Sequence, residues 1–153
     1  MSNYYKDENG FPYLDPIIYN NSSLVKISKK DFDAIVKAIN MPTTDQLLQQ
    51  LTQARKEQER QGVTINGVRY AGDPGDRQAM QESLAFMEDA GIAEFTSWKD
   101  SDDVFRIDHP LVDVVDAYRS IGARRAQLIA AEGQYAAQVV DGSLTEVTGL
   151  TWP

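Results

Sequence analysis

The sequence predicts an α+β fold: a small antiparallel sheet of two hairpins packed by helices, with a long C-terminal helix and extended N- and C-terminal arms. Three observations predict it. An Asn-Gly pair at residues 66–67 lies between two runs of β-forming residues, which is a strong signal for a two-residue hairpin. A second alternating run follows at residues 93–107, and a helical, alanine-rich pattern then continues from Leu111 to about Val140.

Residues 1–26 are rich in aromatic and turn-forming residues, and they predict short extended pieces with a turn at residues 8–10. Pro12 and Pro16 disfavour a regular helix or a central strand here. Two interpretations stay open: the aromatic side chains pack on the domain, or they form an arm that docks on a partner, since Tyr and Phe are enriched in interface cores. The candidates for partner contact in this arm are Tyr4, Tyr5, Phe11, Tyr13 and Tyr19.

Residues 28–40 predict a helix, because Phe32, Ile35 and Ile39 fall on one face. Ser28 is its expected N-cap. Pro42 ends it.

Residues 44–61 predict a second helix, whose apolar stripe of Leu47, Leu48 and Leu51 is short. A helix that is polar over the rest of its surface either bridges between modules or pairs with another helix. The bridging interpretation divides the chain into a docking module (1–42), a helical linker (43–61), an α+β domain (62–140) and an extended C-terminal tail (141–153).

The middle of the chain predicts the sheet and its covering helix. Asp73 is the expected N-cap of a helix that ends at Gly91, with Met80, Leu84 and Met87 on one face. The run at 93–107 predicts the second strand pair, joined by the acidic turn at residues 100–103. Pro110 opens the long helix, and its cap is either Asp108 or His109.

The long helix carries eight residues spaced alternately four and three apart, and we call this set the heptad seam. It consists of Val114, Tyr118, Ile121, Arg125, Leu128, Glu132, Tyr135 and Val139. The pattern fits either an amphipathic helix that covers the sheet, favoured near its start, or helix–helix association, favoured near its end. It predicts a homo-oligomer, with a trimer as the specific expectation. The candidates for partner contact here are Tyr118, Ile121, Leu128 and Tyr135, together with Trp152 in the tail.

Composition excludes several classes of protein. The net charge of −8 disfavours nucleic-acid binding, which needs a basic face. The chain has no cysteine and one histidine, which excludes disulfides, zinc–thiolate sites and multi-histidine metal sites. The chain has no apolar run near the ~20 residues that a membrane helix needs, and its N-terminus lacks the pattern of a signal peptide. We therefore expect no membrane partner and synthesis in a cytoplasm.

No residue pattern predicts catalysis. A lone histidine at a helix start, His109, is typical of a cap or a satisfied polar side chain. Asp100, Asp102 and Asp103 have the spacing of a hairpin turn rather than of a calcium loop. The stretch "AGDPG" lacks the lysine of a phosphate-binding loop. The sequence therefore predicts a protein that is not an enzyme, with no cofactor and no metal.

The order of these elements resembles a family of uncharacterised domains in phage and prophage proteins encoded beside tail-fibre genes. The resemblance covers about residues 50–137, and its markers are "NGVRY", Trp98-Lys99 and "VFRID" in that order. It implies that the domain at 62–140 is tail-fibre-associated and that the chain is a structural subunit or adaptor of the tail fibre or baseplate, assembled in the host cytoplasm and located in the virion tail. The alternative that it implies is a tail-fibre assembly chaperone, absent from the mature virion. A regulatory or inhibitor protein stays open as well.

Overall fold

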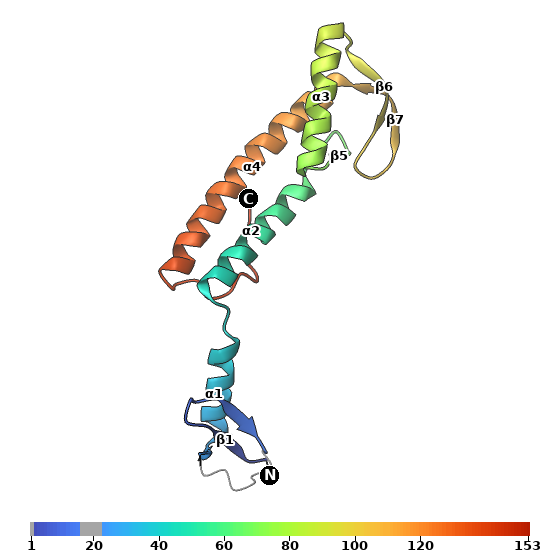
Figure 1. The fold of residues 1–153 in the computed structure, drawn as a ribbon. Coiled ribbons are helices and arrows are strands. Elements are labelled where there is room, and N and C mark those ends of the chain that lie inside the picture. Colours follow the sequence, from blue (N-terminus) through green and yellow to red (C-terminus); the bar gives the residue numbers. More distant parts are fainter. Residues whose placement is uncertain (1, 16–22) are drawn as a thin grey trace. The chain divides into compact units, whose positions relative to one another are not determined.

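The structure is a computed structural model that describes residues 2–15 and 23–153 (Figure 1). The chain divides into two compact units, Met1–Thr43 and Thr44–Pro153. Both combine helices with small antiparallel sheets, so the predicted α+β class is confirmed. The boundary between the units lies close to the predicted end of the N-terminal module.

The first unit is a three-stranded antiparallel sheet followed by a helix. Its strands are β1 (Tyr4–Lys6), β2 (Pro12–Leu14) and β3 (Val25–Ile27), in the order β2-β1-β3, and its helix is α1 (Lys29–Asn40). The predicted turn at residues 8–10 joins β1 to β2. There the Asp7 carboxylate accepts hydrogen bonds from the backbone N–H groups of Asn9 at 2.9 Å and Phe11 at 2.8 Å. Ser28 is the N-cap of α1, as predicted, because its hydroxyl accepts a hydrogen bond from the Asp31 N–H at 3.1 Å.

The second unit is built on two antiparallel helices that lie side by side (Figure 1), α2 (Thr44–Gln61) and α4 (Leu111–Val140). Leu47 and Leu51 of α2 are buried together with Val139 near the end of α4. This packing corrects the interpretation of residues 43–61 as a linker between modules. The short leucine stripe is part of the face of α2 that pairs with α4, and the polar residues Arg55 and Glu59 extend that face toward the end of α2.

Two hairpins and a third helix complete the second unit. The first hairpin pairs β4 (Val63–Ile65) with β5 (Val68–Tyr70), and positive φ values at Asn66 (50°) and Gly67 (79°) form the predicted turn. The helix α3 (Pro74–Ala90) begins at the cap residue Asp73 and ends at Gly91, as predicted. The second hairpin pairs β6 (Glu94–Lys99) with β7 (Phe105–Pro110).

The two hairpins do not form the single sheet that the sequence predicts, and each is a separate two-stranded sheet. The acidic turn of the second hairpin, rather than a strand edge, meets β5. The Ala71 N–H donates to the Ser101 hydroxyl at 2.6 Å, and the Ser101 N–H donates to the Arg69 carbonyl at 3.3 Å.

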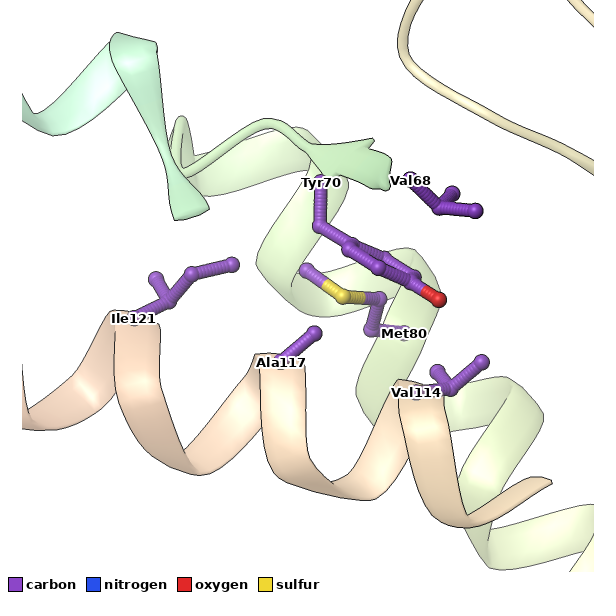
Figure 2. Close-up of a cluster of buried hydrophobic side chains, with 6 residues drawn as sticks. All are labelled: Val68, Tyr70, Met80, Val114, Ala117 and Ile121. Carbon is purple, nitrogen blue, oxygen red and sulfur yellow. The ribbon is translucent and has the colours of Figure 1, made fainter. Parts of the chain in front are cut away.

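The main core of the second unit lies where β5, α3 and α4 converge (Figure 2). Tyr70, which is 2% exposed, and Met80 lie over Ala117 of α4. Val114 and Ile121 flank Ala117 along the same face of the helix, since residues three and four apart share a face. The start of α4 therefore covers the hairpin, as predicted.

A backbone irregularity lies within β7, shortly before α4. Strict alternation along β7 would place His109 on the same side as Phe105 and Ile107, which are 67% and 69% exposed, yet His109 is buried at 4% exposure. Asp108 lies between them with a φ of +51°, and this left-handed residue breaks the alternation. Neither Asp108 nor His109 caps α4, which corrects the prediction: Pro110 is the N-cap residue, and it makes no side-chain capping bond.

Candidate interaction surfaces

The first unit exposes much of its apolar surface. None of residues 2–15 and 23–43 is buried. Phe11 and Leu14 on the first hairpin and Val25 on β3 are each more than half exposed, and so is Ile39 on α1. Exposed apolar side chains on a unit with no buried described residue are candidates for protein contact.

Four of the five aromatic candidates in the N-terminal arm lie among the described residues of this unit. Tyr4 packs on Phe32 of α1, with the ring centroids 5.0 Å apart. Tyr13 donates from its hydroxyl to Asp7 at 3.1 Å and contacts Phe11 edge-on at 5.5 Å. Tyr5 is half-buried. The described part of the arm thus folds as a sheet that packs with α1. Phe11 and Tyr13 are exposed on it and stay candidates for partner contact. The fifth candidate, Tyr19, lies outside the described residues.

The heptad seam of α4 packs within the chain. Ile121 and Leu128 are buried, and Tyr118 is half-buried against the core around Tyr70. The two charged members of the seam face α2, where Glu132 pairs with Arg55 and Arg125 lies 3.4 Å from Glu59. The seam's helical partner is therefore α2 of the same chain, and the buried Ile121 and Leu128 are not available for partner contact.

The C-terminal tail folds back on the two helices. Tyr135 donates from its hydroxyl to the Thr151 carbonyl at 2.6 Å, and the rings of Tyr135 and Trp152 meet edge-on at 5.4 Å. Leu144 and Leu150 pack on the cluster around Leu51. This corrects the interpretation of Trp152 as an exposed docking residue, because its contacts are intramolecular.

A buried ionic network lies between α2, α3 and α4. Its centre is Glu59, a carboxylate that is 8% exposed and forms ion pairs with three guanidinium groups. Arg55 is in hydrogen-bond contact with it, Arg77 is 3.6 Å away and Arg125 is 3.4 Å away. Arg55 also pairs with Glu132, and the interactions with these two carboxylates raise the pKa of Arg55 against the opposing effect of burial.

Beside this network, a groove runs between α3 and α4. We call it the arginine groove, and it has a volume of about 870 Å³. Arg77 of α3 and Arg119 and Arg125 of α4 line it, opposed by one acidic side chain, Glu82. Its α4 wall includes Gly122, where an added Cβ would meet no atom within 4 Å. The arrangement suits an anionic ligand, because guanidinium groups bind carboxylates and phosphates through paired hydrogen bonds.

The single histidine makes a buried hydrogen bond. The Tyr70 hydroxyl and the His109 Nε2 are 2.6 Å apart, and Trp98 stacks on the imidazole ring at 6.0 Å. Burial lowers the pKa of His109 and raises the pKa of Tyr70 to about 12. The pair joins β5 of the first hairpin to β7 of the second, and His109 is a satisfied polar residue, as predicted. The Trp98 indole N–H, in contrast, is buried without a hydrogen-bond acceptor among the described residues.

Two carboxyl groups at the start of α3 share a hydrogen bond. It raises the pKa of Asp76 to about 6, with burial acting in the same direction, and lowers the pKa of Asp73. Asp73 remains the ionised partner because its carboxylate also accepts from the N–H groups of the first helical turn.

Across the described residues, no group of three or more histidine, aspartate and glutamate side chains is arranged to hold a metal ion. In the same part of the chain, no helix is both long enough and apolar enough to cross a membrane.

Sequence reasoning missed the arginine groove and the central role of Glu59. A signal was present: Arg125 and Glu132 interrupt the apolar seam one heptad apart, and Arg55 and Glu59 are spaced as an ion pair on α2. These four charges could have been matched across two helices. The arginines from α3 and the groove itself depend on how that helix packs, which local patterns do not specify.

Comparison with known proteins identifies the second unit. A family model described as "Domain of unknown function (DUF4376)" matches residues 42–149. No curated protein and no solved structure matches the chain. The matched range covers nearly all of the second unit and almost none of the first. Because it spans well over half of the chain, the chain belongs to this family, the domain of unknown function DUF4376.

Proposed function

We propose that the chain is a non-enzymatic bacteriophage tail protein, a structural subunit or adaptor of the tail fibre or baseplate that acts through protein–protein contacts. The observation that carries this proposal is the exposed apolar surface of the first unit, in which no described residue is buried. A sheet and helix this small need a partner to remove their apolar side chains from water. The tail setting rests on the resemblance of residues 50–137 to domains encoded beside tail-fibre genes.

In this proposal the two units have different tasks. The first unit is the attachment module, and Phe11, Leu14 and Val25 contact another tail protein. The second unit is a self-contained folded body with its own cores. Its buried polar and charged side chains Glu59, Asp100 and His109 are engaged in structural hydrogen bonds and ion pairs, which supports a non-enzymatic role. Degradation of host polysaccharide by the purified chain would contradict this part of the proposal.

Mass spectrometry of purified phage particles tests the tail location. We expect the chain at a stoichiometry comparable to that of fibre or baseplate proteins. The alternative, a tail-fibre assembly chaperone, predicts that the chain binds the fibre in the host cytoplasm and is missing from particles. The exposed surface of the first unit supports either role, so particle composition decides between them.

Co-purification with the neighbouring fibre and baseplate proteins tests the attachment surface. We expect the double variant Phe11→Ser/Leu14→Ser to lose co-purification while its second unit keeps its melting temperature. Phe86→Ser is the matched control, because Phe86 is also highly exposed, at 66%, but lies on α3 of the second unit. Equal retention of both variants would reject the first unit as the attachment module.

We also propose that the chain assembles as a homo-oligomer in the tail, with a trimer as the specific expectation. The heptad seam packs within the chain and does not support this proposal. We expect exposed apolar side chains to supply the contacts, such as Phe11 of the first unit or Phe86 and Phe105 of the second. Light scattering of the full chain tests the proposal, and a monomer at high concentration would contradict a self-contained oligomer.

A further inference from the structure

The arginine groove is a concentration of positive charge in a protein whose net charge is −8. Three guanidinium groups line it against the single carboxylate of Glu82, which accepts a hydrogen bond from Gln78 at 2.9 Å. Arg119 is exposed and makes no ion pair with any carboxylate in the part of the chain that the structure describes. The groove therefore has more positive charge than its own lining neutralises.

The ionic network holds two of these arginines in place. Arg77 and Arg125 approach Glu59 at 3.6 Å and 3.4 Å, while Arg55 is closer to the same carboxylate. One carboxylate shared by three guanidinium groups leaves N–H donors of Arg77 and Arg125 available to a ligand. Arg77 is fixed further by donating to the Gly72 carbonyl. Two donors are thus pre-positioned, and less ordering is needed when a ligand binds.

We propose that the arginine groove binds an acidic segment of a partner protein, with glutamate or aspartate carboxylates paired to Arg77, Arg119 and Arg125. The groove volume of about 870 Å³ lies within the range of ~300–1,000 Å³ typical of ligand pockets. Gly122 leaves room on the α4 wall for a peptide backbone, and the half-buried Tyr118 offers an apolar surface beside it. A protein segment is favoured over nucleic acid because the surrounding negative charge repels a long polyanion, whereas a short acidic segment lies inside the groove.

This site lies in the second unit and shares no residue with the attachment surface of the first. Its occupancy does not depend on the tail role, so the two proposals fail separately. Loss of co-purification in the first-unit variants, described above, leaves peptide binding in the groove unaffected.

Fluorescence anisotropy with the full chain tests the site. The probe is a fluorescein-labelled peptide of alternating glutamate and alanine, and the reference peptide replaces each glutamate with glutamine. We expect the full chain to bind the acidic peptide and not the reference, and Arg119→Glu to weaken binding by about tenfold or more, since the substitution places a like charge in the site. Lys56→Glu is the matched control, because Lys56 is exposed on α2 outside the groove. This substitution makes the same change in net charge as Arg119→Glu and should leave the Kd for the acidic peptide within about twofold.

A second pair of variants tests the groove by filling it. Gly122→Gln should weaken peptide binding, because its side chain enters open space in the groove, while Gly133→Gln on α4 outside the groove should not. Circular dichroism establishes that each variant is folded. The proposal is overturned if the full chain does not bind the acidic peptide, or if Arg119→Glu and Lys56→Glu behave alike. Tighter binding of a single-stranded oligonucleotide, or self-association that Arg119→Glu abolishes, would also overturn it by assigning the groove to another occupant.

Discussion

Gly62 and Gly67 have similar left-handed backbones but different surroundings. Their φ values are +68° and +79°. A Cβ at Gly67 would meet no atom within 4 Å, whereas a Cβ at Gly62 would lie 1.8 Å from the Tyr70 carbonyl oxygen. The strand that holds Tyr70 in the core therefore passes directly over Gly62, and only glycine fits there.

This contrast predicts that alanine at Gly62 and alanine at Gly67 lower the stability of the protein by different amounts. Gly67→Ala should lower the free energy of unfolding by about 1 kcal/mol, the cost of the left-handed conformation alone. Gly62→Ala adds a backbone collision to that cost, so it should destabilise the protein by several times as much or prevent folding. Urea denaturation of the two variants measures the difference, and equal losses would contradict the close approach at Gly62.

His109 predicts how stability depends on pH. Burial lowers its pKa in the folded protein, so the unfolded chain binds a proton at a higher pH than the folded one does. Stability is therefore fully present above the unfolded value of 6.5 and is lost as the pH falls through it. Asp76 acts in the opposite direction: its raised pKa of about 6 makes the folded state gain stability as the pH falls from there toward 3.8.

A comparison with His109→Gln separates the two effects, because the contribution of Asp76 cancels between the proteins. From about pH 8 to about pH 5.5, wild type should lose more stability than His109→Gln does. The measurement is the free energy of unfolding in urea at each pH. Parallel curves for wild type and variant would show that His109 does not titrate differently on folding.

At the scale of elements, local patterns predicted most of the helices and strands, and packing decided what could not be predicted. The Asn66-Gly67 turn, the Asp73 cap and the Gly91 end depend on neighbouring residues only, and all three are confirmed. The partner of α4 depends on chain segments that are distant in sequence. A heptad seam looks the same whether it packs on another chain or on α2, so the sequence could not assign it.

The ionic network between α2 and α4 predicts that removing the charge of Glu59 lowers the stability of the second unit strongly. Glu59→Gln leaves three guanidinium groups around a neutral side chain, and it should destabilise the second unit by about 3 kcal/mol. Glu57→Gln is the control on the same helix, because Glu57 is exposed and pairs with Arg60 at 3.1 Å, and its loss should cost less than ~1 kcal/mol. Thermal unfolding of the two variants measures both effects, and a Glu59→Gln variant as stable as Glu57→Gln would contradict a structural network.

The C-terminal tail predicts a stabilising role for Trp152. Its half-buried ring packs on Tyr135, so Trp152→Ala should lower the free energy of unfolding by about 2 kcal/mol. Phe105→Ala provides the comparison, since Phe105 is 67% exposed and its loss should change stability little. If both variants melt like wild type, the tail is not held by Trp152 and the residue returns to being a docking candidate.

At the scale of the whole molecule, the second unit buries apolar side chains in its interior, whereas no described residue of the first unit is buried. The second unit has two clusters of buried side chains, one around Tyr70 and one around Leu51. The described residues of the first unit include no buried side chain, and this unit lies almost wholly outside the range that the family model matches. The second unit therefore holds the fold that defines the family, and we expect the stability of the first to depend on contacts beyond its own residues.

This difference predicts how fragments behave. A fragment of residues 44–153 should unfold cooperatively at nearly the melting temperature of the second unit in the full chain, because its two cores are complete. A fragment of residues 1–43 should show no cooperative transition. None of its described residues, 2–15 and 23–43, is buried, and so short a segment does not offset its conformational entropy. Circular dichroism and calorimetry of the two fragments and the full chain measure this, and adding the partner protein to the first fragment should restore the transition. Cooperative melting of residues 1–43 alone would show that the first unit is already stable, and its exposed apolar side chains would then not require a partner.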